Sequence, residues 1–386
     1  MFDPPAELVS MRESGPVIRL MLPSGKEGWL ITRFNEAKSV LSDARFSSAN
    51  RGASNPVSEV PDELIEETTI PGLFVGMDPP EHTRYRRLLA GYFTLRRMRL
   101  LEETVQDVVS DVLNALDETR GPIDIVSAFS VPVSHVVMCK LLGIPDGGRD
   151  EFHRCVETML QLDRPQDEVL EAFGEVRRHL RNAIEERESN PDSGIISDLI
   201  HRPRGDDRLT AAELEGVAFL ILVAGYDTTY NMISMGALTL LCHPDQLARL
   251  RAQPSLMDNA VEELLRYLTV TQVGLVRVAT EPVRVGDVVI EAGESVVVSA
   301  FSANRDPRRF ADPDRFDVAR TGVQQLTFGH GIHQCIGAHL SRLEMKIALA
   351  ELFRRYPTLR LAVPAEQLNL RTDMPIYGPA ELPVEW

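Results

Sequence analysis

The 386-residue sequence lacks a long hydrophobic run. Its longest apolar stretch, residues 217–225, is far shorter than the roughly 18–20 residues that cross a bilayer. The N-terminal segment MFDPPAELV has an early acid and prolines but no basic region, so no secretory signal is expected. We therefore expect a cytoplasmic protein with no membrane partner.

Basic charge and paired cysteines are scarce as well. Lys and Arg number 41 against 57 Asp and Glu, which gives a formal net charge of -16. Nucleic acid is therefore not expected as a partner, because nucleic-acid binders present a basic surface. Cys139, Cys155, Cys242 and Cys335 lie far apart with no CxxC pair, so no disulfide framework is expected.

The hydrophobic periodicity predicts a mainly helical chain with small β-sheets. Strand-like runs lie at residues 17–22 and 29–32, and valine-rich hairpins lie near 280–300, so β-structure is expected in these regions. A helix at about 211–241 is apolar nearly all round, which is typical of the core of a large domain. No linker divides the sequence, and residues 1–386 are expected to form a single domain.

Two polar stretches are predicted without regular structure. Residues 46–75 are rich in Ser, Pro, Asn and acidic residues and favour a long loop. Residues 190–210 are polar and interrupted by proline and glycine, which indicates a connector between helices.

The segment FGHGIHQCIG, from Phe328 to Gly337, is the most informative. Glycines on both sides of Cys335 let the backbone approach a flat ligand closely. The cysteine also precedes a predicted helix, where N–H groups and the helix dipole favour a thiolate. Two other interpretations stay open. A single cysteine is usually a small buried residue, and a zinc site could take its four ligands from His330, His333, Cys335 and His339.

This segment resembles the haem-binding signature of the cytochrome P450 family, F-x-x-G-x-H-x-C-x-G, at every fixed position. The resemblance implies a triangular, mainly helical, single-domain fold that holds haem b. It makes Cys335 the ligand of the iron and places Phe328, Gly329 and Gly337 around the cofactor. A thiolate ligand pushes electron density toward oxygen and favours O–O cleavage.

A second motif, AGYDTT, begins at Ala224 in the middle of the apolar helix. Buried polar groups there are costly without partners, and a threonine hydroxyl can bond to the carbonyl four residues earlier. A satisfied polar kink is therefore one interpretation. The resemblance instead makes Asp227 and Thr228 catalytic, with Thr228 contacting dioxygen, Asp227 admitting protons and Ala224 beside the haem. Tyr226 stands where the family often has histidine, which leaves the proton route open.

Glu263 and Arg266 form an E-x-x-R quartet that puts acid and base on one helix face. Most such pairs are solvated surface pairs. In the family this pair is internal and is joined by an arginine from a later proline-rich segment. Arg315 is our choice for that third member, with Arg320 as the alternative. The implied role is structural support of the cysteine segment.

Basic residues suggest partners for the carboxylates of a haem. His82 and Arg86 lie four residues apart, on one face of a predicted helix that follows two prolines. A basic surface helix is the plainer interpretation. The resemblance assigns His82, Arg86, Arg277 and His333 to the haem propionates, which charged donors suit.

The resemblance implies an oxidoreductase of the soluble bacterial, actinobacterial type. It would insert one oxygen atom from O2 into an apolar small molecule, by hydroxylation or epoxidation. The substrate would be a secondary metabolite, such as a macrolide or another polyketide, or a xenobiotic. A haem-binding sensor or carrier without turnover is the alternative, and a peroxide-driven enzyme is a third. Asp227 and Thr228 argue against both, because neither function needs them.

The electron donor is expected to be external, since the sequence shows no flavin or iron–sulfur domain. A ferredoxin, itself reduced by a ferredoxin reductase, is the expected partner. Arginines crowd residues 84–99 of this acidic chain, and Arg342 follows the cysteine segment. They indicate either a docking patch that steers an acidic partner or a solvated basic helix.

Overall fold

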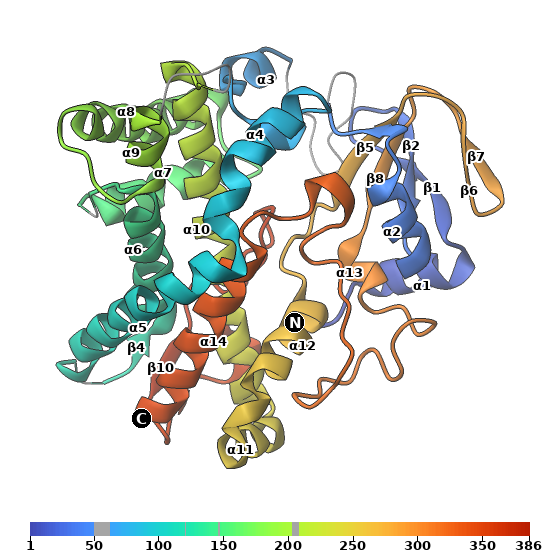
Figure 1. Ribbon diagram of the computed structural model, residues 1–386. Helices are drawn as coiled ribbons and strands as arrows, with labels where there is room; N and C mark the ends of the chain where they lie inside the picture. The colour runs from blue at the N-terminus through green and yellow to red at the C-terminus, as the bar shows by residue number, and fades with distance from the viewer. Residues whose placement is uncertain (50–61, 120, 146, 203–207) are drawn as a thin grey trace. The chain divides into compact units, whose positions relative to one another are not determined.

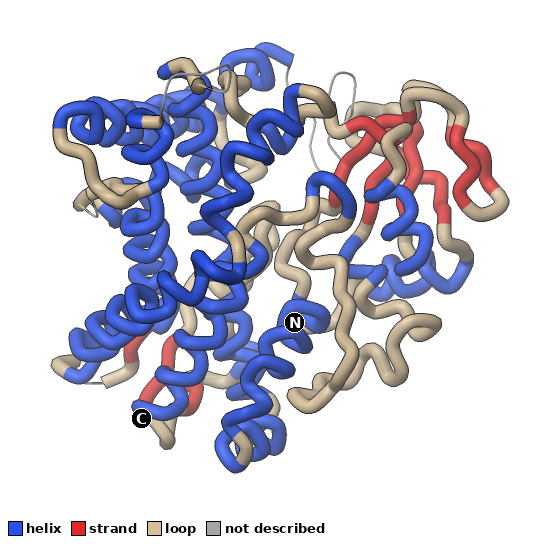
Figure 2. Tube along the Cα trace, in the orientation of Figure 1, coloured by secondary structure: helices blue, strands red, loops and turns tan. Residues whose placement is uncertain are grey.

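The computed structural model describes residues 1–49, 62–119, 121–145, 147–202 and 208–386. These residues form two compact units, drawn as ribbons in Figure 1. The first unit comprises residues 1–49, 75–78 and 235–338, and the second comprises residues 62–74, the described part of 79–234, and residues 339–386. The secondary structure, coloured in Figure 2, is mainly helical with small sheets, as the sequence predicts.

The first unit is built around a five-stranded sheet of order β1-β2-β8-β5-β3. Strands β2 and β8 are parallel, with Leu30 opposite Val297, and the other neighbours in the sheet are antiparallel. The expected valine hairpin is β6–β7, outside this sheet. The strands are β1 Val17–Met21, β2 Glu27–Ile31, β3 Phe46–Ser47, β5 Leu275–Ala279, β6 Val283–Val285, β7 Val288–Ile290 and β8 Ser295–Val298.

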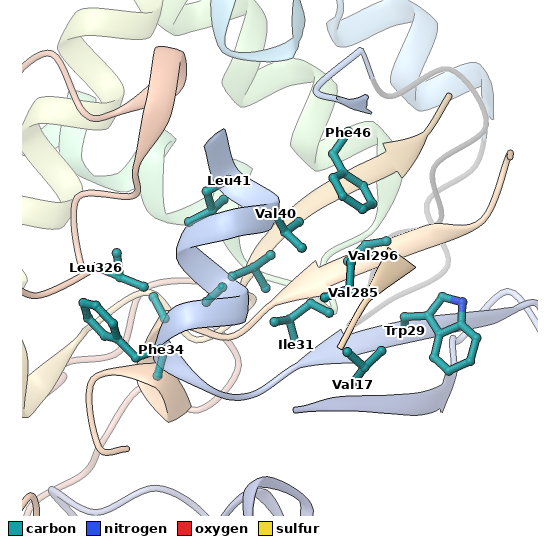
Figure 3. Packing of buried hydrophobic residues seen from close by; sticks show 14 of the residues in the cluster. Val17, Trp29, Ile31, Phe34, Val40, Leu41, Phe46, Val285, Val296 and Leu326 are labelled. Carbon is teal, nitrogen blue, oxygen red and sulfur yellow. The ribbon is translucent and has the colours of Figure 1, made fainter. Parts of the chain in front are cut away.

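Hydrophobic residues cover both faces of the central strand β8, whose four residues are all buried. Trp29, Ile31 and Val296 join Phe34 and Val40 of helix α2 in one hydrophobic cluster, shown in Figure 3. Leu30 and Val297 point to the other face, where Leu8 and Met11 of helix α1 pack. The helices of this unit are α1 Ala6–Ser14, α2 Phe34–Ser42, α11 Pro244–Ala252, α12 Met257–Leu268 and α13 Ala300–Ala303, with short 3-10 turns at Phe74–Gly76, Pro254–Leu256 and Gly331–His333.

The second unit is helical around α10, Ala211–Cys242, whose last residues belong to the first unit. Its other helices are α3 Asp62–Thr68, α4 Glu81–Ala90, α5 Leu95–Asp117, α6 Val131–Leu142, α7 Arg149–Leu160, α8 Gln166–Ser189, α9 Ile195–His201 and α14 Ala338–Arg355, with short turns at Gly91–Phe93, Val126–Ser130 and Ala365–Gln367. A small antiparallel sheet has the order β4-β10-β9, from Ile123–Asp124, Pro383–Glu385 and Arg360–Leu361.

Two predictions for the polar stretches were partly wrong. Helix α3 forms within the expected loop at 46–75, whose residues 50–61 lie outside the described part of the chain. Helix α9 forms within the expected connector, because Ile195, Ile196 and Leu199 give it a buried apolar face. Both helices have seven residues, shorter than the windows in which periodicity is clear.

Across the described residues, no helix combines the length and apolar character that crossing a membrane requires.

Candidate functional site

Cys335 lies in a tight loop just before α14, and its side chain is exposed. Its N–H donates to the carbonyl of Phe328 at 2.8 Å, which closes the loop. The N–H of Gln334 donates to the carbonyl of Gly331 at 3.1 Å in a short 3-10 turn. The sulfur is therefore presented from a backbone that hydrogen bonds hold in place.

Glycine is required at two positions of this loop. Gly329 and Gly331 have φ angles of 68° and 76°, the left-handed region in which a side chain is strained. A Cβ on Gly331 would also lie 2.4 Å from the carbonyl oxygen of Leu41 at the end of α2. The loop thus packs directly on backbone, and a Cβ on Gly337 would lie 3.9 Å from the Cys335 sulfur.

The E-x-x-R pair lies in the same unit as the cysteine loop and is fully buried. Glu263 and Arg266 of α12 form a bidentate ion pair, with Arg266 Nε and Nη2 donating at 2.7 and 2.8 Å. The third member is Arg320, whose Nε donates to Glu263 Oε1 at 3.0 Å. Our choice of Arg315 was wrong: its main-chain carbonyl accepts from Arg320 at 2.9 Å. Residue type alone does not separate two arginines five positions apart.

Asn304 and Thr327, which sequence reasoning missed, connect α12 to the start of the loop. Asn304 Nδ2 donates to the hydroxyls of Thr269 and Thr327 at 2.8 and 2.9 Å, and its Oδ1 accepts from the N–H of Leu326. The Thr327 hydroxyl donates to the carbonyl of Leu265 at 2.7 Å. Thr327 directly precedes Phe328, so this network fixes where the cysteine loop begins.

Arg277 lies on β5 of the same unit and is only 8% exposed. Burial lowers the pKa of its guanidinium, and the negative charge of Asp78 partly offsets this. The neighbouring Leu275 of β5 would lie 3.5 Å from a Cβ on Gly329, so this strand packs against the cysteine loop. A buried arginine of this kind suits a carboxylate partner.

Helix α10 has one uncovered face within its buried length. Leu220, Val223 and Thr228 are partly exposed and Ala224 is exposed, at a spacing that places them on one side of the helix. The Thr228 hydroxyl donates to the carbonyl of Ala224 at 2.7 Å. The back-bond considered from sequence is therefore present, and it lies on the uncovered face.

Asp227 is 2% exposed, beside this face. Burial is the main cause that raises the pKa of its carboxyl to about 6. Asn231 donates to the main-chain carbonyl of Asp227 at 2.8 Å, and Asp227 Oδ2 lacks a hydrogen-bond partner within the described residues. Gly225, a poor helix former, is explained by Met138 of α6, whose Sδ would lie 2.6 Å from a Cβ there.

His82 and Arg86 share helix α4, with His82 2% exposed and Arg86 partly exposed. On the same helix Arg84 bonds to Glu213 of α10, and the Tyr85 hydroxyl donates to that carboxylate at 2.7 Å. These bonds hold the pKa of Glu213 at about 2 against the opposing effect of burial. Arg84 therefore anchors α4 to α10 and is no part of an open basic surface.

The candidate residues divide between the two units. The first unit contains Phe328, Gly329, His333, Cys335, Gly337 and Arg277, and the second contains His82, Arg86, Ala224, Asp227 and Thr228. The described residues contain no cluster of three or more His, Cys, Asp or Glu side chains that could hold a metal ion. His330, His333, Cys335 and His339 thus do not form the four-ligand set of a zinc site.

The donor set fits a haem. An exposed cysteine sulfur stands in a glycine-framed loop, the buried Arg277 and His82 can meet carboxylates, and α10 offers an uncovered face at Ala224. A flat macrocycle with one axial thiolate and two carboxylates needs these features.

Comparisons with known proteins agree with this chemistry. The family model "Cytochrome P450" matches residues 7–366. "Cytochrome P450 105C1" of a Streptomyces species is 42% identical over 385 residues, covering 100% of this chain and 96% of that protein. The crystal structure of CYP105P1 in complex with filipin I has a TM-score of 0.94 and 41% identity, covering 100% of this chain and 96% of that one. The mycinamicin VIII C21 methyl hydroxylase MycCI from Micromonospora griseorubida, bound to mycinamicin VIII, has a TM-score of 0.93 and 32% identity, covering 100% and 97%.

Proposed function

The chain belongs to the cytochrome P450 family, and we propose that it inserts one oxygen atom from O2 into an apolar secondary metabolite. The observation that supports this most is the exposed sulfur of Cys335 in its hydrogen-bonded glycine loop. We further propose haem b as the cofactor, the cytoplasm as the location and one folding domain for residues 1–386.

In this proposal Cys335 would bind the haem iron through its thiolate, and Phe328, Gly329 and Gly337 would frame it. When bound, the haem supplies the activation of dioxygen, which side chains alone do not perform. Arg277, His82, Arg86 and His333 would hold its propionates. Arg277 and His82 are both largely buried, where a charged hydrogen bond to a carboxylate is strong.

Thr228 and Asp227 are the proposed catalytic residues. The Thr228 hydroxyl donates a hydrogen bond to the Ala224 carbonyl, so its oxygen can accept a further hydrogen bond on the uncovered face of α10. Burial raises the pKa of Asp227 to about 6. This value is close to neutral pH, where such a carboxyl can both take up and release a proton. The pair therefore suits proton delivery during oxygen activation, which a sensor or carrier does not need.

Relatives support the substrate class. The two similar crystal structures hold filipin I and mycinamicin VIII, and another relative is named pentalenic acid synthase. We propose a substrate of this kind, a largely apolar secondary metabolite such as a macrolide or another polyketide.

The proposed electron donor is a ferredoxin, reduced by a ferredoxin reductase. Arg87 at the end of α4 and Arg96 and Arg99 at the start of α5 are exposed. Leu95 directly precedes Arg96, Leu100 directly follows Arg99, and these two leucines are 60% and 65% exposed. A basic surface with exposed apolar residues suits a small acidic partner, because charge steers the approach and apolar contact holds the complex.

Isotope labelling tests the proposed reaction. Secondary metabolites are first screened for those that change the haem absorbance of the purified protein. A responding compound is then incubated with ferredoxin, reductase and ¹⁸O2. One labelled oxygen atom per product molecule is expected, and none from labelled water. Label from water, or binding without any product in the reconstituted system, would support a carrier or sensor instead.

A further inference from the structure

A carboxylate in the first turn of α10 joins this helix to α4. Glu213 Oε1 accepts from Arg84 Nη1 at 2.5 Å and from the Tyr85 hydroxyl at 2.7 Å. Its Oε2 accepts from the N–H of Thr210 at 2.7 Å, and the N–H of Glu213 donates to the Thr210 hydroxyl at 3.2 Å. One carboxylate oxygen therefore binds α4, while the other closes a capping box at the start of α10.

The link between Arg84 and Glu213 is partly shielded from water. Their side chains are only 29% and 16% exposed. Arg84 Nη2 also donates to the carbonyl of Arg208 at 2.9 Å, so the guanidinium binds at two points at or just before the start of α10. A charge-assisted hydrogen bond is stronger where solvent is partly excluded, which makes this pair stronger than an ion pair on the open surface.

Residues 70–74 complete the junction between the two helices. The ring of Phe74 is stacked on that of Tyr85, with 6.2 Å between the centroids and 17° between the planes. Gly72 and Gly216 let the main chain of this segment lie directly on α10, because a Cβ on either glycine would collide with main-chain atoms of the other segment. Glu213 thus stands where three segments pack closely, and α4 cannot shift against α10 without breaking these contacts.

Arg84 and Tyr85 lie between two proposed haem contacts. His82 precedes them on α4 and Arg86 follows them, so the four residues occupy little more than one helical turn. Within a turn the backbone is held together, because each N–H bonds to the carbonyl four residues earlier. The bonds from Arg84 and Tyr85 to Glu213 therefore also determine where His82 and Arg86 lie.

Glu213 belongs to the same helix as the proposed catalytic residues. Helix α10 runs from Ala211 to Cys242. Ala224 and Thr228 follow Glu213 after about three and about four turns. The uncovered face of α10 and the proposed propionate contacts of α4 are thus tied together at one carboxylate.

We propose that Glu213 is a positioning residue, which sets the place of His82 and Arg86 relative to the uncovered face of α10. It acts through Arg84 and Tyr85 and takes no part in bond making or proton transfer. The proposal rests on the proposed haem contacts of α4 and deepens them, since it assigns the group that keeps both donors in place.

Loss of this link should change the reduction potential of the haem. A propionate that receives a weaker hydrogen bond from His82 or Arg86 keeps more of its negative charge uncompensated. Uncompensated negative charge disfavours the addition of an electron to the iron, so the potential should become more negative. Haem should also dissociate about tenfold faster, which is the effect of weakening one hydrogen bond to a charged group.

Two variants on opposite sides of the link carry the test. Glu213→Ala removes the carboxylate and its cap, whereas Arg84→Ala breaks the link and leaves the capping box of Thr210 intact. A displaced α4 predicts the same result for both, a more negative potential and faster haem loss. A direct effect of charge predicts opposite shifts, because one variant removes a negative charge and the other a positive one. Glu213→Gln keeps a hydrogen-bond acceptor and should retain most of the wild-type behaviour.

Glu215 provides a matched control on the same helix. It is 6% exposed and accepts from Arg177 Nε of α8 at 2.5 Å and from Arg181 Nη1 at 3.4 Å. Its loss also breaks a buried ion pair of α10, but α8 carries no proposed haem contact. Glu215→Ala should therefore lower the thermal stability at least as much as Glu213→Ala does, while it leaves the potential and the rate of haem loss unchanged.

Both quantities are measured on the purified holoenzyme. Spectroelectrochemical titration gives the reduction potential, and transfer of haem to excess apomyoglobin gives the dissociation rate. A more negative potential and faster haem loss in both Glu213→Ala and Arg84→Ala are expected. Opposite shifts of the potential in these two variants, changes confined to Glu213→Ala, or equal changes in Glu215→Ala would each refute the positioning role.

Arg86→Ala separates this proposal from the one on which it rests. It should also lower the potential and speed haem loss. If Arg86→Ala keeps the wild-type potential and rate, the propionate contact fails and the positioning role falls with it. If Arg86→Ala is impaired while Glu213→Ala and Arg84→Ala behave as wild type, the positioning role is refuted and the propionate contact stands.

Discussion

Replacing Glu263 by alanine should destabilise the protein strongly. The carboxylate accepts two bonds from Arg266, one from Arg320 and one from the N–H of Asp317. Without it, Arg266 stays buried at 0% exposure, and its remaining partners among the described residues are the main-chain carbonyls of Asn304, Pro313 and Arg315. A buried guanidinium would then have no counter-charge.

Breaking a buried ion pair from one side costs about 3–5 kcal/mol, because the remaining charge is uncompensated. The chain offers a control with the same spacing. Glu351 and Arg354 of α14 also form an E-x-x-R pair, but their side chains are 36% and 68% exposed. Exposed pairs of this kind contribute about 0–1 kcal/mol. The two glutamate-to-alanine changes should therefore differ by about 2–5 kcal/mol.

Thermal unfolding at a fixed scan rate, together with haem retention, measures this difference. Glu263→Ala should lower the midpoint far more than Glu351→Ala and should release haem earlier, because the Glu263 network supports the segment that leads to the cysteine loop. Equal shifts in the two variants would show that the buried pair has no such role, and the reasoning would be refuted.

Three further predictions concern Gly331 in the cysteine loop, the carboxyl of Asp227 and the exposed Arg87 at the end of α4. Gly331→Ala should cost more stability and haem than Gly322→Ala: both glycines have positive φ, but only Gly331 would push a Cβ against backbone. Equal losses would assign the effect to strain alone. Burial raises the pKa of Asp227 from 3.8 to about 6, so the folded protein binds this proton more tightly than the unfolded chain. The contribution of this group to the free energy of unfolding should therefore decrease as the pH rises from about 4 to about 6. Asp227→Asn should flatten that fall in pH-dependent denaturation, and an unchanged slope would contradict it. Arg87→Glu should slow reduction by a ferredoxin by about tenfold at low salt and less at high salt, whereas exposed Arg251→Glu should not slow it. Stopped-flow rates that change with neither the salt concentration nor Arg87→Glu would show that Arg87 does not belong to the docking site.

The sequence predicted features whose cause is local. Gly329 and Gly331 have positive φ, and Gly331 packs closely on backbone, so the need for glycine at these two positions is local. The mostly apolar helix expected at 211–241 is present as α10. A helix that is apolar nearly all round is predicted to be buried whatever its neighbours are, so this feature could be predicted locally. The β6–β7 hairpin could likewise be predicted, because its valine-rich strands flank a Gly-Asp turn in the sequence.

Features that depend on distant partners could not be predicted. Arg371 meets Tyr230 across 141 positions, and neither residue belongs to a motif. Asn304 connects Thr269 to Thr327 in the same way. The choice between Arg315 and Arg320 depends on how an irregular segment turns, which residue types do not encode. Single side chains in irregular backbone thus gain their roles only from the fold.

The most direct test of the central claim is the absorbance of the reduced protein under carbon monoxide. With Cys335 as the axial thiolate, the purified protein should be red and should show a Soret band shifted far to longer wavelength. Cys335→Ala should lose this band, and Cys155→Ala, a partly exposed cysteine of α7, should keep it. A colourless protein with stoichiometric zinc, or a shifted band that survives in Cys335→Ala, would contradict the account.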